Sequence, residues 1–278
     1  MGYLLLAVLS SAMISISMRL STGKVRSHFT MVATNYIVCA ILGAIYADFS
    51  LLSTGNSGWG LTIGVAVLNG VVLLSGMLLL QSSTRKNGIV LSSLFMKLGL
   101  LVPVVMSVLF FHEAPTWLQI LGFLIASGAI VLFNLKKDSQ GNRFSMGLIL
   151  LLLLNGGADA IVKIFEAVGP GALSDHFLCF SFSVAFALCL CLVLVKKEQP
   201  DVKALLFGAM VGVCNFFSFK FLLGALAQIP AVVVFPTFSV AAMLTVTLSG
   251  VLFFKERLDK RQWLAFAAVI VALVLLNI

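Results

Sequence analysis

Long uninterrupted apolar runs fill this chain from one end to the other. Each approaches or exceeds the length of about 20 residues that a helix needs to cross the hydrocarbon core of a bilayer. The ten runs cover residues 3–20, 28–47, 59–80, 87–111, 116–134, 144–165, 174–195, 202–224, 229–253 and 261–277. Their apolar residues are continuous rather than alternating, which argues against strands. Because backbone groups in lipid must be paired within their own segment, the runs predict an all-α integral membrane protein with ten transmembrane helices.

The composition agrees with this prediction and excludes a soluble globule. Hydrophobic residues make up 61% of the chain and charged residues only 10%, too few to give a folded domain a polar surface. The formal net charge is +8, but the basic residues lie in short connections between apolar runs. That arrangement indicates orientation in a membrane rather than a nucleic-acid site. The expected partner is therefore the lipid bilayer, and no nucleic acid.

The chain also contains one unit written twice. Residues 110–134 read FFHEAPTWLQILGFLIASGAIVLFN, and residues 253–277 read FFKERLDKRQWLAFAAVIVALVLLN, at a constant offset of 143. Two five-helix repeats are therefore expected, residues 1–135 and 144–278, joined by the connection 136–143 into one membrane domain. Since five is odd, the second repeat would enter the membrane inverted relative to the first, as in many secondary transporters.

The positive charges predict an orientation. Of the 18 Lys and Arg residues, 15 lie in the odd-numbered connections or at the helix ends that border them, and none in the even-numbered connections. The other three, Lys97, Lys163 and Lys220, fall within apolar segments. Positively charged loops stay in the cytoplasm. We therefore expect a multi-pass protein of the plasma (inner) membrane with both chain ends on the outer side of that membrane.

Signatures of metal or catalytic chemistry are missing from the sequence. The five cysteines lie in apolar runs without a CxxC pair, and the three histidines lie in separate connections without ligand spacing. No HExxH, GxSxG or complete P-loop is present. We therefore expect no metal, no cofactor and no enzymatic activity.

The repeated turns FFHEAPTWLQ and FFKERLDKRQ, with two five-helix halves in 278 residues, resemble the EamA-type branch of the drug/metabolite transporter (DMT) superfamily. The resemblance implies a ten-helix bundle around a central cavity and the export or exchange of small metabolites. It also implies cytoplasmic termini, the reverse of the orientation that the loop charges predict.

The repeated turns carry two kinds of candidate residue. Thr116 with Gln119, and Asp259 with Gln262, have the spacing of a capping box at the start of a helix. Glu113 and its counterpart Glu256 are either interfacial anchors or gates at the two mouths of the transport path.

One face of the helix predicted at 144–165 bears a polar stripe. Four residues recur along it at helical spacing, and three residues of the first helix repeat the pattern at an offset of 144. The stripe is Asn155, Asp159, Lys163 and Glu166, and its counterpart is Ser11, Ser15 and Arg19. It lines a cavity in one interpretation, with Asp159 and Glu166 as candidate proton carriers. In the other, it is packing in which Asp159 and Lys163 neutralise each other.

Lys97 is the most telling single residue. It lies ten residues into the run 87–111, about 15 Å deep at the helical rise and close to the bilayer centre. Inserting such a charge costs roughly 2.5–3.5 kcal/mol on translocon scales, so something must offset it. The partner is either Asp159, in a salt bridge between the halves, or the substrate itself.

Further residues complete the expected substrate site and its moving parts. Lys220 is a weaker candidate, because a lysine near a helix end also snorkels to the interface. Neutral hydrogen bonds would come from Asn35, Asn69, Asn155 and Asn215. Pro103 and Pro236 interrupt their helices and serve either as gating joints or as static kinks.

The sequence thus predicts a secondary-active transporter working by alternating access, with a mildly cationic site for a metabolite bearing a carboxylate or phosphate. Protons or a counter-substrate would drive it, and it would be a monomer or homodimer. Efflux of cationic drugs or quaternary ammonium compounds is the first alternative, although the run 3–20 contains no acidic residue. A carrier or scramblase for lipid-linked substrates is the second.

Overall fold

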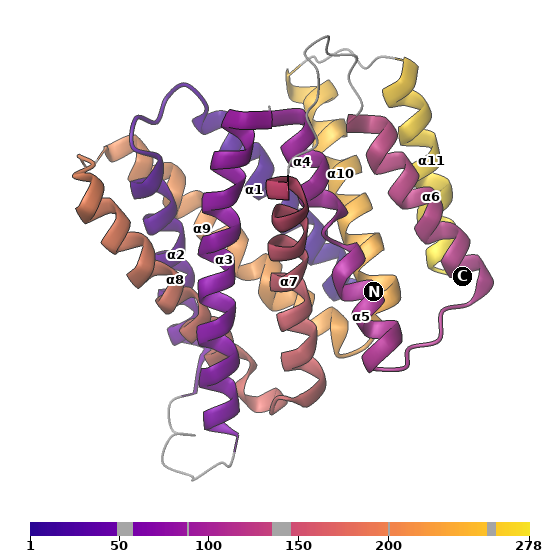
Figure 1. Cartoon of the computed structure of the whole chain (residues 1–278), viewed down its shortest axis with the longest axis horizontal. Helices are drawn as coiled ribbons and strands as arrows, with labels where there is room; N and C mark the ends of the chain where they lie inside the picture. Colours follow the sequence, from indigo (N-terminus) through magenta and orange to yellow (C-terminus); the bar gives the residue numbers. More distant parts are fainter. Residues whose placement is uncertain (49–57, 88, 135–145, 200, 255–259) are drawn as a thin grey trace. The chain divides into compact units, whose positions relative to one another are not determined.

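A computed structural model describes residues 1–48, 58–87, 89–134, 146–199, 201–254 and 260–278, and the regular structure within these ranges is entirely helical. The elements are α1 (Gly2–Ser21), α2 (His28–Tyr46), α3 (Trp59–Asn87), α4 (Ile89–Leu98), α5 (Leu101–Phe110), α6 (Trp117–Asn134), α7 (Met146–Val168), the short 3₁₀ turn η2 (Gly171–Leu173), α8 (Ser174–Lys196), α9 (Val202–Leu226), α10 (Ala231–Phe254) and α11 (Lys260–Leu276) (Figure 1).

Each of the ten apolar runs forms helix among the described residues, which confirms the expected all-α membrane fold. Eight helical segments are long and apolar enough to cross a membrane, and α6 contributes a shorter apolar one, Trp117–Leu132. Helix α11, with 17 residues, accounts for the tenth run. The main difference from the expected bounds is α3, which continues to Asn87 instead of ending near Leu80.

One expected helix is divided in two. The run 87–111 forms α4 and α5, with Gly99 and Leu100 between them. Pro103 has no amide hydrogen to donate to the carbonyl of Gly99 four residues earlier, and that carbonyl accepts from Val102 instead, at 2.9 Å. The expected interruption is thus present near Pro103, whereas α10 continues through Pro236. A gating role for either proline remains a prediction.

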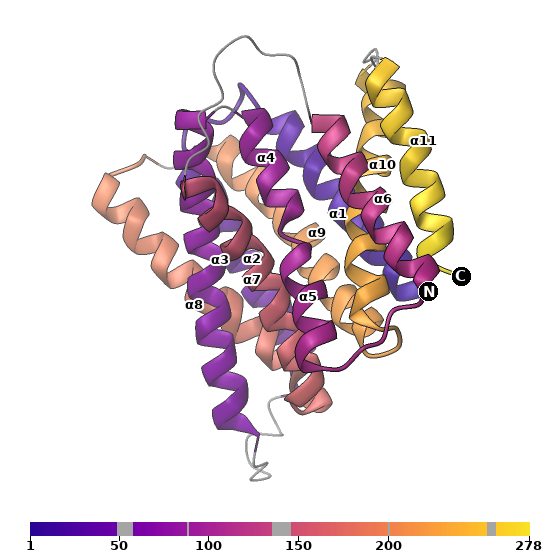
Figure 2. The same cartoon turned by 45° about the vertical axis from the view of Figure 1, so that its right-hand side comes forward.

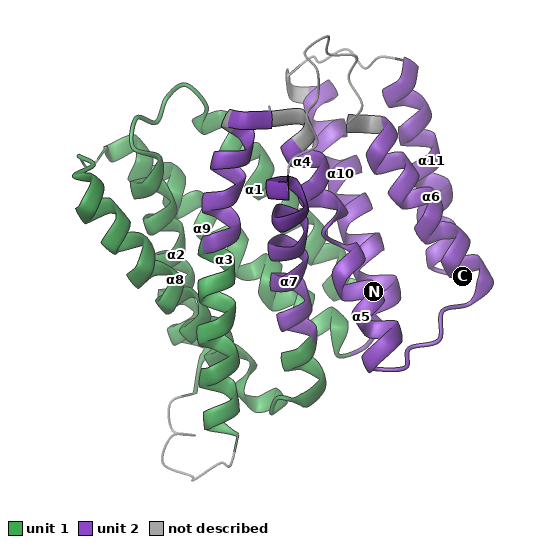
Figure 3. Ribbon diagram, in the orientation of Figure 1, with its two compact units in different colours: residues 1–74, 164–227 green, residues 75–163, 228–278 purple. Residues whose placement is uncertain are grey.

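The helices form two compact units, each drawing on both halves of the sequence (Figure 3). Unit 1 comprises residues 1–74 and 164–227, and unit 2 comprises residues 75–163 and 228–278. The units and the expected repeats are therefore different divisions of the chain. The repeat bounds 1–135 and 144–278 stay a prediction, and the connection 136–143 lies outside the described residues.

Small residues allow the helices of unit 1 to approach closely. Helix α2 packs on both α8 and α9, and α1 packs on α9. A Cβ on Gly208 of α9 would lie 2.5 Å from the carbonyl oxygen of Met31, and one on Gly43 of α2 would lie 2.8 Å from the Cα of Cys179. These contacts require glycine, as is common where membrane helices cross.

Unit 2 has its core where α6 and α11 lie side by side (Figure 2). The alanines that form small faces on these two helices are buried there, including Ala126, Ala129 and Ala272. Leu94 and Leu100 near the α4–α5 break, with Val240 and Met243 of α10, pack into the same cluster.

Candidate functional site

Within unit 2, α7 crosses the break between α4 and α5 at a pair of glycines. A Cβ on Gly156 would lie 2.1 Å from the carbonyl oxygen of Gly99, so no side chain fits between the two backbones. Beside this contact, the Asn155 Nδ2 group donates a hydrogen bond of 3.0 Å to the carbonyl oxygen of Met96. Asn155, expected to face a substrate, therefore holds α7 against the end of α4.

Lys97 and Asp159 flank this crossing. Lys97 comes directly after Met96, whose carbonyl oxygen Asn155 binds. Asp159 lies one helical turn beyond Asn155 on the same face of α7. Within the described ranges neither forms an ion pair, so the expected salt bridge between Lys97 and Asp159 is not present there. Each side chain remains partly accessible. The crossing thus brings a lysine and a carboxyl group that do not neutralise each other onto facing helices.

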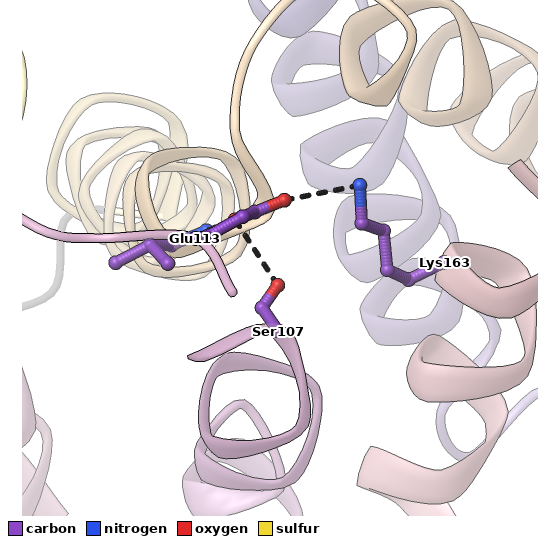
Figure 4. A network of polar contacts seen from close by, with 4 residues as sticks. Ser107, Glu113 and Lys163 are labelled. Atoms are coloured by element: carbon purple, nitrogen blue, oxygen red, sulfur yellow. Dashed lines mark hydrogen bonds and ion pairs between the residues drawn. The ribbon is translucent and has the colours of Figure 1, made fainter. Parts of the chain in front are cut away.

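Lys163, one turn further along α7, forms an ion pair with Glu113 (Figure 4). The Lys163 Nζ atom lies 3.1 Å from the Glu113 Oε1 atom and 5.4 Å from the centre of the Phe111 ring. Lys163 is thus paired with an acid other than Asp159, the partner that one interpretation of the stripe gave it. Lys163 reaches beyond its own helix to the connection that follows α5, where a carboxylate is already held in place.

Glu113 joins three helices of unit 2 from the connection that follows α5. Its Oε2 atom accepts hydrogen bonds from the Ser107 hydroxyl of α5 at 3.1 Å and from the Val232 amide at the start of α10 at 3.0 Å. Its other oxygen binds Lys163 of α7. We call Ser107, Glu113, Lys163 and Val232 the Glu113 latch.

The contacts in the latch keep Glu113 ionised. Burial by itself raises the pKa of this carboxyl group, but the amides of Val232 and Ala231 and the ammonium group of Lys163 outweigh it. Together they lower the pKa of Glu113 below its ordinary value of 4.5. The start of α10 adds to this preference, because a helix N-terminus favours negative charge.

In unit 1, two of the expected neutral donors bind each other. Asn215 Nδ2 on α9 donates to Asn35 Oδ1 on α2 at 3.2 Å, and the Cys39 thiol lies 3.2 Å from the carbonyl oxygen of Gly212. Asn69 on α3 differs, because its buried Oδ1 atom has no hydrogen-bond partner among the residues placed by the structure.

Lys220 of α9 forms an ion pair that the sequence did not reveal. Its ammonium group lies 2.6 Å from the Asp175 Oδ1 atom and 4.0 Å from the centre of the Tyr46 ring. Asp175 lies in the first turn of α8, where an acidic residue is commonly read as a favourable helix start. Lys220 is thus already neutralised within unit 1.

The remaining candidates have local or undescribed surroundings. Ser11 and Ser15 are half-buried on α1, and the Ser15 hydroxyl donates to the Ser11 carbonyl at 3.4 Å. Glu166 is half-buried in α7 and has interactions of its own. Glu256 lies outside the described residues, as does Asp259 of the second expected capping box.

The first capping box is confirmed. The Thr116 amide donates to Gln119 Oε1 at 3.0 Å, and the Gln119 amide donates to Thr116 Oγ1 at 3.2 Å. These two residues therefore pair the free backbone amides at the start of α6, which is a structural role at the helix end.

The second half of the sequence has a family match. Residues 145–278 match the model of the EamA-like transporter family. This part of the chain is similar to the EamA-like transporter family. This match agrees with the resemblance seen in the repeated turns, and the apolar helices indicate a multi-pass membrane protein.

Two whole-chain comparisons extend beyond residues 145–278. An uncharacterized protein of Haemophilus influenzae is 27% identical over 280 residues, covering 95% of this chain and 93% of its own length. A crystal structure superposes with a TM-score of 0.72 at 16% identity, covering 98% of this chain and 94% of that one. The second likeness establishes the fold alone.

Proposed function

We propose that this protein is a secondary-active transporter that moves a small polar metabolite bearing a carboxylate or phosphate, as an exporter or exchanger. It would work by alternating access, with the Lys97 ammonium group binding the anionic group of the substrate. The observation that carries this proposal is a lysine within a membrane span whose charge no acid of the described residues neutralises.

The surroundings of Lys97 favour a binding role over a structural one. A charge inside the membrane is costly, and structural lysines there are normally paired or reach the interface. Lys163 and Lys220, the other two lysines of the apolar segments, do have acidic partners, Glu113 and Asp175. Lys97 also lies beside a helix break, and discontinuous helices commonly form the binding sites of secondary transporters.

Two further groups would support transport. Asp159, partly accessible and one turn from the α7 crossing, would carry the proton that drives an exchange step. The Glu113 latch would gate one end of the path, because releasing one carboxylate frees α5, α7 and the start of α10 together. Glu166 and the kinks at Pro103 and Pro236 remain further candidates for these roles.

Counterflow into liposomes tests the proposal. The purified protein is reconstituted, the vesicles are loaded with pools of anionic, zwitterionic and cationic metabolites, and uptake of labelled compounds is measured. We expect Lys97→Ala to reduce counterflow of the anionic compound by about tenfold or more, and Lys97→Arg to reduce it less, since arginine keeps the charge but not the shape. Lys86→Ala, which removes an exposed lysine near the end of α3, is the matched control.

The same experiment separates the alternatives. Unaltered anion uptake by both Lys97 variants would remove this residue from the site. Counterflow of cations that Asp159→Asn abolishes would indicate cationic efflux that depends on the Asp159 carboxyl group. Movement of labelled phospholipid headgroups between leaflets would indicate a lipid carrier.

A further inference from the structure

A hollow of about 510 Å³ lies in unit 1 where two helix connections meet. It is formed by the connection between α1 and α2 and by the residues between α8 and α9. Its lining includes Lys24, Arg26, Ser27, Glu198, Asp201 and Lys203. None of these residues belongs to the transport site proposed above.

Both carboxylates of the hollow accept hydrogen bonds from backbone amide groups. Glu198 Oε2 accepts a hydrogen bond from the Phe29 amide at 3.2 Å and another from the Ser27 hydroxyl. Asp201 accepts from the Arg26 amide at 3.1 Å and from the Lys203 amide at 3.1 Å. The carboxylates therefore fasten the starts of α2 and α9 and tie the two connections together.

The side-chain cations of the hollow are left available. Lys24, Arg26 and Lys203 are exposed, and in the part of the chain that the structure describes none of them forms an ion pair within 4 Å. Lys196 and Lys197, also exposed, add two positive charges at the end of α8. Amides of Arg26 and Lys203 hold the pKa of Asp201 below its usual range, so Asp201 keeps its negative charge, and with it these two hydrogen bonds, to lower pH than a free aspartate would.

Val202 lines this hollow, and other exposed apolar side chains lie close to it in the sequence. Leu194 and Val195 at the end of α8 are 67% and 78% exposed, and Val202 and Leu206 at the start of α9 are 70% and 63% exposed. In a membrane these side chains face acyl chains, so a phosphate bound among the cations would have its lipid tails beside α8 and α9. A soluble phosphate compound would gain nothing from that surface.

We propose that this hollow binds the phosphate headgroup of an anionic phospholipid, with Lys24, Arg26 and Lys203 around the phosphate and acyl chains against α8 and α9. Basic pockets at the membrane surface bind anionic headgroups in this way, and a volume of several hundred Å³ suits a headgroup-sized ligand. Bound lipid would hold the α1–α2 and α8–α9 connections together from the membrane side. The site does not depend on the transport proposal.

Lipid retention tests this site. The full chain is purified in detergent and titrated with phosphatidylglycerol or phosphatidylcholine, and the bound lipid is counted by native mass spectrometry. We expect selective binding of phosphatidylglycerol, which Arg26→Ala combined with Lys203→Ala weakens by about tenfold or more. The control, Lys86→Ala combined with Arg261→Ala, removes the same charge from exposed positions at the end of α3 and the start of α11 and should bind like the unaltered protein.

Each other outcome overturns the site. Equal loss in both double variants would show a general charge effect of the positive loops. Equal binding of phosphatidylglycerol and phosphatidylcholine would show that the site does not distinguish lipids by the charge of the headgroup. Displacement of the lipid by millimolar glycerol phosphate would show that soluble phosphate compounds occupy the hollow without the acyl contact. A thermal unfolding scan of each variant ensures that only folded protein is compared.

Discussion

Glu113 shows how much one side chain in a loop can organise. It lies in a connection of six residues between α5 and α6, yet it binds α7 through Lys163 and α10 through the Val232 amide. Lys163 is buried, and the Glu113 carboxylate helps to offset the loss of hydration of its charge.

We therefore expect Glu113→Gln to lower stability by about 1–3 kcal/mol, because the amide keeps the shape but removes the negative charge that faces the buried Lys163. The measurement is the unfolding temperature of the purified protein in detergent. Combining Glu113→Gln with Lys163→Met should cost less than the sum of the two single changes. Additive losses would mean that the two side chains do not interact.

Acid should release the same latch. The pKa of Glu113 is lowered in the folded protein, so its contribution is complete above the ordinary value of 4.5 and disappears as the pH falls through the lower folded-state pKa. The unaltered protein should lose stability steadily below about pH 5, and the Glu113→Gln variant should lose less over the same range. Parallel curves for the two proteins would rule out Glu113 as the titrating group.

At the scale of elements, the crossing of α7 with the α4–α5 break depends on the absence of side chains. Gly156 faces the Gly99 carbonyl and Val102, whereas its neighbour Gly157 has no atom within 4 Å of the place where a Cβ would stand. Alanine substitutions at these two adjacent glycines therefore distinguish the effect of helix propensity from the effect of helix packing.

Gly156→Ala should destabilise the protein and impair counterflow, since its methyl group would overlap the Gly99 backbone and push α7 away from Lys97. Gly157→Ala gains the same helix propensity of about 1 kcal/mol without any clash, so it should be neutral or stabilising. Unfolding temperatures and counterflow of both variants make the comparison. Equal behaviour would show that the helices do not meet at Gly156.

For the whole molecule, the loop charges predict an orientation that accessibility labelling can test. In a variant without the native cysteines, single cysteines are placed at exposed positions in even-numbered connections (Ala114→Cys, Ala172→Cys) and in odd-numbered ones (Thr22→Cys, Gln199→Cys). An impermeant maleimide added to intact cells should label the first two and reach the others only after permeabilisation.

Labelling of the odd-numbered connections alone would show that the termini are cytoplasmic, as the family resemblance implies. Labelling of Ala114→Cys without Ala172→Cys would contradict the inverted relation of the two repeats. That relation requires the two connections to lie on the same side of the membrane.

The sequence by itself determined the ten spans, the capping box at Thr116 and the interruption near Pro103. These features depend on local properties, namely the hydropathy of consecutive residues, the spacing of a cap and a missing amide hydrogen. Neighbouring residues fix them before any helix meets another.

Tertiary structure decided which charges meet. Helical spacing placed Asp159 and Lys163 on one face, but the fold gave Lys163 to Glu113 and Lys220 to Asp175, and it bound Asn35 to Asn215. These partners come from different helices or connections, so only the packing of helices, down to a bare contact between Gly99 and Gly156, brings them within reach. The same packing left Lys97 and Asp159 without ion-pair partners among the described residues, and this makes them the centre of the proposed site.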